Sequence, residues 1–139
     1  MKYSCSIEIN SPIEKVIKQW QDENHFKEWQ DGFQSIELIN GEKNAENSKS
    51  KIVLQQGKRR IELIETIIAN DLPAAKKASY EHIHMTNTQT SRFEKLEDNK
   101  TRYISEVEYT QFNGLMPKLM AKLFPGMFKK QSEKWMKQF

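Results

Sequence analysis

The chain has 139 residues, enough for one domain whose core needs neither a disulfide nor a metal. The net charge of +3 is too small to indicate nucleic-acid binding by itself. No apolar run approaches the roughly 20 residues that a membrane-spanning helix needs. We therefore expect a single folded domain over residues 1–139, with no transmembrane segment and no nucleic-acid partner.

The first segment, residues 3–9, alternates apolar and polar side chains with the period of a half-buried strand. It lacks the apolar core of a signal peptide. The single cysteine, Cys5, has no partner for an intramolecular disulfide. These features predict a cytoplasmic protein that begins with a β-strand.

Two short helices are predicted after this strand. The first carries an apolar stripe from Ile13 to Trp20, and the second places Phe26 and Trp29 on one side before Gly32 ends it. We expect Trp20 to pack under the sheet. Trp29, together with Phe33, is expected to lie at the mouth of a pocket and to touch a ligand.

The middle of the chain reads as six strands separated by short turns. Short connections favour antiparallel pairing of neighbouring strands. One of these turns is predicted at Thr86-Asn87. The expected strands are 33–40, 50–56, 60–69, 76–86, 88–96 and 102–111.

The C-terminal segment, 115–139, returns to helical spacing, with Leu, Met and Phe side chains along one wide stripe. Pro125-Gly126 is expected to kink this helix. Six lysines accompany the stripe, against one acid, Glu133. If the sheet grips the apolar stripe, the lysines are solvated; the alternative is contact of this helix with an anionic membrane surface.

A seven-stranded antiparallel sheet can bury this stripe only if it curves around the helix. The curvature leaves a hollow near one end. A hollow of this kind, mostly apolar with a few polar groups, is a common small-molecule site.

The order of elements and the stretches "INSPIEKV" and "HFKEWQDGFQSIEL" resemble the START-like superfamily, also called the polyketide cyclase/lipid-transport or SRPBCC group. The resemblance covers the whole chain. Ser11 replaces the usual alanine, and Ile17 stands where Trp or Phe is common. The positions that match the family's opening motif are Ile9, Pro12, Glu14, Val16 and Trp29.

The resemblance implies an α+β helix-grip fold: a seven-stranded curved antiparallel sheet, two short helices after the first strand, and a long C-terminal helix in the concave face. It implies a cavity for a small hydrophobic or amphipathic ligand in a carrier or sensor. Members also include cyclases or dehydratases and chaperone-ATPase activators, so these two functions stay open as alternatives. We expect a binding protein rather than an enzyme.

The densest polar cluster is "SYEHIHMTNTQTSRF". Tyr80, His82 and His84 share one face of a strand, and a turn at Thr86-Asn87 would place residues 89, 91 and 93 opposite them. This wall either lines the cavity, where a histidine acts as acid or base, or it is the solvated outer face, with residues 83 and 85 turned inward.

Glu65 is predicted to share a face with Leu63 and Ile67, which would place a carboxylate among apolar side chains. A buried acid needs a partner, and Arg92, Tyr103 and His84 are the candidates. The alternative is that Glu65 reaches solvent at an edge.

His82 and His84 also have the spacing of two metal ligands on a strand, but a metal site needs three or four ligands. We therefore expect no metal and no cofactor. If the chain is an enzyme, His82, His84 and Glu65 are the acid–base candidates. The side chains expected to line the ligand site are Trp29, Phe33, Glu65, Tyr80, His82, His84, Arg92, Phe93, Tyr103, Met116 and Met120.

Overall fold

A computed structural model describes residues 1–123 and 125–139; the side chains at positions 116, 120, 121, 123 and 125 also lie outside the described part. Seven strands form one antiparallel sheet in the order β1-β7-β6-β5-β4-β3-β2. The strands are β1 (Lys2–Ile9), β2 (Phe33–Asn40), β3 (Lys49–Gln56), β4 (Arg59–Asp71), β5 (Ala75–Glu81), β6 (Met85–Glu97) and β7 (Lys100–Phe112).

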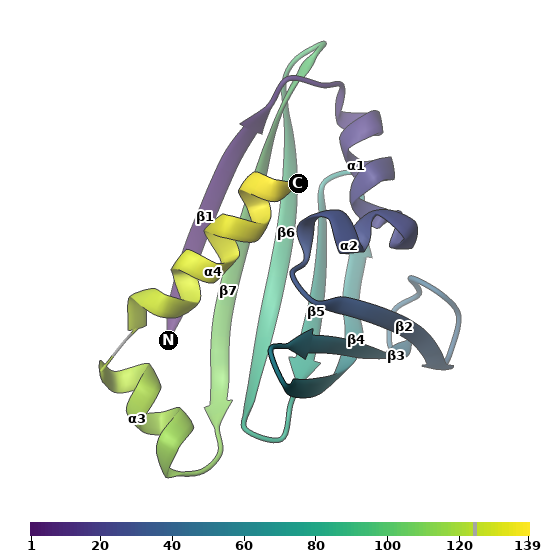
Figure 1. Ribbon diagram of the computed structural model, residues 1–139. Helices are drawn as coiled ribbons and strands as arrows, with labels where there is room; N and C mark the ends of the chain where they lie inside the picture. Colours follow the sequence, from purple (N-terminus) through teal and green to yellow (C-terminus); the bar gives the residue numbers. More distant parts are fainter. Residues whose placement is uncertain (124) are drawn as a thin grey trace.

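The helices lie between β1 and β2 and after β7, as the sequence predicts. The two short helices after β1 are α1 (Ile13–Gln21) and α2 (Phe26–Trp29), joined by the 3-10 turn η1 (Glu23–His25). The C-terminal helical segment has two parts, α3 (Leu115–Leu123) and α4 (Pro125–Gln138). Figure 1 shows α4 crossing in front of β1 and β7, while α3 lies below the start of β1 and to the left of the lower end of β7.

The expected hairpin between β5 and β6 is present, but the turn predicted at Thr86-Asn87 is wrong. The chain turns at His82–His84 instead, where the His82 amide donates to the Met85 carbonyl oxygen at 2.9 Å. The His84 amide donates to Nδ1 of His82 at 3.3 Å, so an imidazole supports the turn. As a result Tyr80 faces Asn87 across the two strands.

Helix α4 defines the inner face of the sheet, since it rests on β1 through inward-pointing side chains. The Tyr3 hydroxyl and Ser132 Oγ lie 2.7 Å apart, and Phe128 packs on Tyr109 with ring centroids 4.7 Å apart. Tyr3, Cys5, Ile7 and Ile9 alternate toward this side, as the period-2 pattern predicts.

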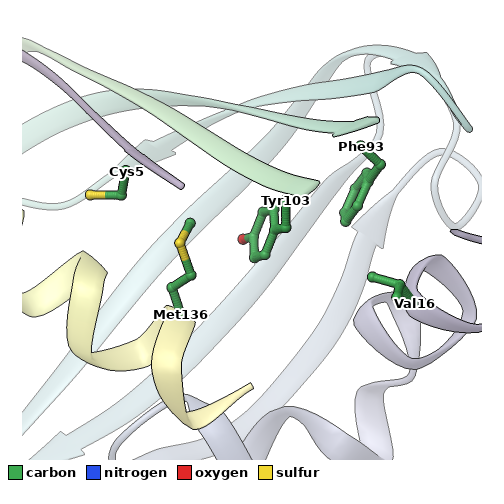
Figure 2. Packing of buried hydrophobic residues seen from close by; sticks show 5 residues of the cluster. All are labelled: Cys5, Val16, Phe93, Tyr103 and Met136. Carbon is green, nitrogen blue, oxygen red and sulfur yellow. The ribbon is translucent and has the colours of Figure 1, made fainter. Parts of the chain in front are cut away.

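The core lies between this inner face and the helices. Val16 of α1 points toward Phe93, and Met136 of α4 points toward Tyr103 (Figure 2). Phe93 and Tyr103 stack at 5.1 Å, and both are buried, with exposed fractions of 4% and 5%. This core holds both α1 and α4 against the inner face of the sheet: α1 contacts β6 and β7, and α4 contacts β1.

Candidate ligand-binding site

A row of polar side chains crosses the inner face of the sheet away from the core. Glu65 pairs with Tyr80, Tyr80 with Asn87, and Asn87 with Tyr109 on four consecutive strands. Residues directly opposite each other in an antiparallel sheet point to the same face. The strand register, not sequence proximity, therefore brings these four side chains together.

Tyr80 is the hydrogen-bond partner of Glu65, its hydroxyl donating to Oε2 at 2.9 Å. Burial is the main cause that raises the pKa of Tyr80 well above its ordinary value of 10.0, and the charge of Glu65 and this hydrogen bond act in the same direction. The hydroxyl therefore stays protonated as a donor. The prediction that Glu65 lies on the face of Leu63 and Ile67 agrees with the strand register. Its hydrogen-bond partner is Tyr80, and not Arg92, Tyr103 or His84 as the sequence suggested.

Lys76 brings a positive charge to the same face. Its Nζ donates to Asn44 Oδ1 at 2.9 Å and lies 5.6 Å from the centroid of the Trp20 ring. Burial lowers the pKa of Lys76, while the carboxylates of Glu65 and Glu23 oppose this shift. The Lys76 ammonium and the Glu65 carboxylate are thus each hydrogen-bonded to a neutral group on this face.

An aromatic wall stands beside Lys76. The Trp20 Nε1 donates to the Tyr103 hydroxyl at 3.3 Å, and the Trp20 ring meets Phe93 edge-on at 5.2 Å. Burial is the main cause that raises the pKa of Tyr103, although hydrogen bonds from Trp20 and Ser91 lower it. Phe93 and Tyr103, which the sequence predicts in the ligand site, belong to the packed core. Their contact with a ligand stays a prediction.

A second group of aromatic side chains lies where α2 meets the end of α4, and we call this group the rim. Trp29 packs edge-on against Phe26 at 6.1 Å and against Phe139 at 5.6 Å, and Phe26 contacts Phe33 at 5.5 Å. Figure 1 shows the end of α4 close to α2. Trp29 and Phe33, which the sequence predicts at the mouth, lie together at this rim; their contact with a ligand stays a prediction.

Three buried polar atoms have no hydrogen-bond partner among the described residues: Nε1 of Trp29, Nε1 of Trp135 and Oδ1 of Asn87. A buried unpaired donor or acceptor costs about 1–3 kcal/mol, so such atoms are uncommon in folded proteins. Trp29 Nε1 is a donor at the rim, and Asn87 Oδ1 is an acceptor on the inner face. A ligand with both kinds of polar group could pair with them.

The remaining predicted site residues are more scattered. Arg92 is on the outer face and its Nε bonds Glu106 Oε1 at 2.5 Å, so the expectation that it pairs with Glu65 is wrong. His82 and His84 lie in the β5–β6 turn with rings 5.2 Å apart. Burial lowers the pKa of His82, and the neighbouring His84 adds to the shift.

The alternative in which residues 83 and 85 turn inward is also wrong for Ile83, which is 76% exposed. The predicted Met116 and Met120 have side chains outside the described part of the structure. Among residues 1–123 and 125–139, no three His, Cys, Asp or Glu side chains converge as metal ligands. No helix in these ranges is long and apolar enough to cross a bilayer.

Lys76 and Asn87 are members of the site that the sequence reasoning did not identify. A signal for Lys76 existed, because it has the same strand parity as Ala78 and Tyr80 and must therefore share their face. Asn87 was assigned to a turn, so its inward direction followed only from the observed hairpin.

The grooves that the described residues outline on the outer face are open, and charged side chains stand in their walls. The larger has a volume of about 690 Å³ and is lined by Lys77, Thr90, Arg92 and Glu106, among others. Its charged side chains form ion pairs such as that of Arg92 with Glu106. Solvated pairs of this kind contribute little and do not mark a ligand site.

An ion pair joins α4 to the loop after α2 and gives a pH-dependent prediction. The Lys134 ammonium lies 2.9 Å from Asp31 Oδ2, and its hydrogen bond holds the pKa of that carboxyl below the ordinary 3.8. A carboxyl with a lowered folded-state pKa stabilises the fold above its unfolded pKa, and this contribution is lost as the pH falls through the folded value.

Lys134→Gln should therefore lower the free energy of unfolding slightly near neutral pH, by roughly 0.2–1 kcal/mol for a surface pair, and by nothing once Asp31 is protonated. Urea denaturation of both proteins from pH 7 down to about pH 3 measures the difference. A difference that persists unchanged in acid would contradict the assignment to Asp31.

A seven-stranded antiparallel sheet that curves around a C-terminal helix, with two short helices after the first strand, is the START-like helix-grip fold. Solved structures of this fold span nearly the whole chain. No protein-family description matches the sequence. No curated protein matches it either.

An aromatase/cyclase, Zhui, from Streptomyces sp. R1128 aligns with a TM-score of 0.79 and 8% identity, covering 99% of this chain and 90% of its own. The protein TTHA0849 from Thermus thermophilus aligns at 0.76 and 18%, covering 99% and 93%. A START superfamily protein from Mycobacterium smegmatis aligns at 0.72 and 13%, covering 97% and 93%. At these identities the likeness establishes the fold alone.

Proposed function

We propose that this protein binds a small apolar or amphipathic molecule between the inner face of the sheet and its helices, as a carrier or sensor. The supporting observation is the partial exposure of inward-facing polar side chains. Glu65, Lys76 and Gln89 point to the covered side of the sheet yet remain only half-buried. In a filled interior these side chains would be either fully buried or replaced by apolar ones.

The chemistry of this face favours an amphipathic ligand. Trp20, Trp29 and Phe33 offer aromatic surface, which dominates the binding of apolar groups. The unpaired Trp29 Nε1 and Asn87 Oδ1, with Lys76 and Glu65, offer a few polar contacts that would orient the molecule. We keep the cytoplasm as the expected location, because Cys5 is a buried free thiol.

Titration with N-phenyl-1-naphthylamine, a neutral fluorophore that brightens in apolar sites, tests this proposal. We expect saturable binding of one probe per chain. Gln89→Trp should weaken it about tenfold or more, since Gln89 lies opposite Ala78 and Val107 on the inner face and a larger side chain would occupy the space.

Thr90→Trp is the matched control, because Thr90 is the next residue of the same strand and lines the outer groove. It should leave the probe affinity unchanged. Native mass spectrometry of freshly purified protein should also detect a bound small molecule. If the wild type shows no saturable binding, or if both variants bind equally well, the hollow is not a binding site.

A second candidate function is acid–base catalysis of the cyclase or dehydratase kind. The observation that favours it is the hydrogen bond of the protonated Tyr80 hydroxyl to Glu65, because the carboxylate can accept a proton from a bound carbonyl compound while the neighbouring hydroxyl donates a hydrogen bond to its oxygen. If the molecule recovered from the protein is converted during incubation by the wild type, but not by Glu65→Gln, this function replaces simple binding.

A further inference from the structure

Helix α3 has a different environment from α4, although both belong to one apolar segment of the sequence. Among the described residues, α3 contacts mainly α4, whereas α4 rests on β1. In Figure 1, α3 lies below the start of β1 and to the left of the lower end of β7. The sheet therefore covers Phe128 and Met136 of α4, as expected of the apolar stripe, whereas Leu115 and Leu119 of α3 are exposed.

One face of α3 combines apolar and cationic side chains in contact with solvent. Leu115 is 80% exposed and Leu119 is 41% exposed, and Lys118 and Lys122 are also exposed. These positions are spaced i, i+3, i+4 and i+7, so they share one side of the helix. The sequence of α3 contains no acidic residue, and this face therefore carries two positive charges, those of Lys118 and Lys122.

The β5–β6 turn extends the apolar part of this surface. Ile83 is 76% exposed at the tip of the turn. Asn113, just before α3, holds the turn in place: its backbone amide donates to the His84 carbonyl oxygen at 2.7 Å, and its Nδ2 donates to the Ile83 carbonyl oxygen at 3.3 Å. Ile83 and Leu115 are thus fixed at neighbouring points of the same end of the molecule.

We propose that this surface, formed by Ile83 and by Leu115, Lys118, Leu119 and Lys122 of α3, docks on an anionic lipid bilayer. Large apolar side chains with this much exposure mark an interaction site when they cluster. Leucines flanked by lysines suit the boundary between acidic headgroups and acyl chains. A second copy of the chain is a poorer partner, because a two-fold contact would bring Lys118 and Lys122 against the same lysines.

Co-sedimentation with vesicles tests the proposal independently of any ligand in the hollow. The wild type should bind vesicles of equal parts phosphatidylglycerol and phosphatidylcholine, bind pure phosphatidylcholine much less, and lose affinity as salt is added. The double variant Lys118→Glu/Lys122→Glu should bind the acidic vesicles with an affinity lower by about 30-fold or more, because each lysine near an anionic surface raises the affinity roughly fivefold.

The matched control is Lys15→Glu/Lys18→Glu, which makes the same change of charge at two exposed positions of α1. This control should lower the affinity for the acidic vesicles far less than the change at Lys118 and Lys122 does. Leu115→Glu should also release the protein without changing its thermal unfolding, because a side chain this exposed contributes little to the core.

Three results would overturn the proposal. The first is wild-type protein that does not bind the acidic vesicles. The second is an equal loss of binding in the α1 and α3 charge variants, since that would reflect total charge alone. The third is a dimer, detected by analytical ultracentrifugation, that Leu115→Glu dissociates, because the surface would then bind a second copy of the chain.

Discussion

Phe93→Ala is expected to lower the free energy of unfolding by about 3–5 kcal/mol, the usual cost of removing a buried aromatic ring. The ring is 4% exposed, stacks on Tyr103 at 5.1 Å and meets Trp20 at 5.2 Å. Its removal would leave a cavity where α1 rests on β6 and β7. Urea denaturation followed by tryptophan fluorescence measures the loss, because Trp20 reports on this contact.

Leu96→Ala on the same strand provides the comparison. Leu96 lies near the end of β6 and is 36% exposed, so its truncation should cost under about 1 kcal/mol. Equal losses in the two variants would mean that Phe93 does not anchor α1 to the sheet.

Gly32→Ala is expected to destabilise the protein by about 2–5 kcal/mol, for two reasons that add. Gly32 has φ +76°, in the left-handed region, where a side chain costs roughly 1–2 kcal/mol. In addition, a Cβ at this position would overlap the backbone carbonyl oxygen of Gln55 on β3, and overpacking of this kind costs about 1–3 kcal/mol. The strand cannot move away, because the Gln55 amide donates to the Gly32 carbonyl oxygen at 2.7 Å.

Gly57→Ala separates these two reasons. Gly57 has φ +62°, also left-handed, but a Cβ there meets no atom of the described residues within 4 Å. This variant should therefore lose only the backbone part, about 1–2 kcal/mol. If thermal and urea unfolding show the same loss of stability for both glycine variants, the close approach of Gly32 to β3 does not contribute to the effect of Gly32→Ala.

The Gly32 contact also matters for the proposed ligand site. Gly32 joins α2 to β2, between Trp29 and Phe33 of the rim. A shift of this connection would move both aromatics. A Gly32→Ala protein that still folds should therefore bind N-phenyl-1-naphthylamine more weakly than the Gly57→Ala protein does.

The strands were predictable because their signals are local. Alternation along β1 correctly placed Tyr3, Cys5 and Ile7 on one face, and the same rule placed Glu65 with Leu63 and Ile67. The alternation of side chains along β6 also excludes Arg92 from the inner face. Arg92 lies between Ser91 and Phe93, which point inward, so its own side chain must point outward, and the structure places it on the outer face.

The turn between β5 and β6 was harder to predict from the sequence, because Thr86-Asn87, taken by itself, has the composition of a turn. In the folded chain Asn87 pairs with Tyr80 and Tyr109 across two neighbouring strands, and the turn moves to His82–His84. The pairing is supported on both sides of β6, and the imidazole of His82 accepts the His84 amide. Contacts between strands that are distant in sequence outweighed the local turn preference.

The sequence by itself determined the order of elements and which side chains share a face along β1 and in the middle of β4. These features follow from side-chain periodicity, which acts within a few residues. The resemblance to the START-like superfamily added the expectation of a helix-grip arrangement. Tertiary structure decided the partner of Glu65, the position of Lys76 beside Trp20, and the separation of α3 from α4. Each of these depends on strand register and on which part of a helix the sheet can cover, and both are set by contacts between residues far apart in the chain.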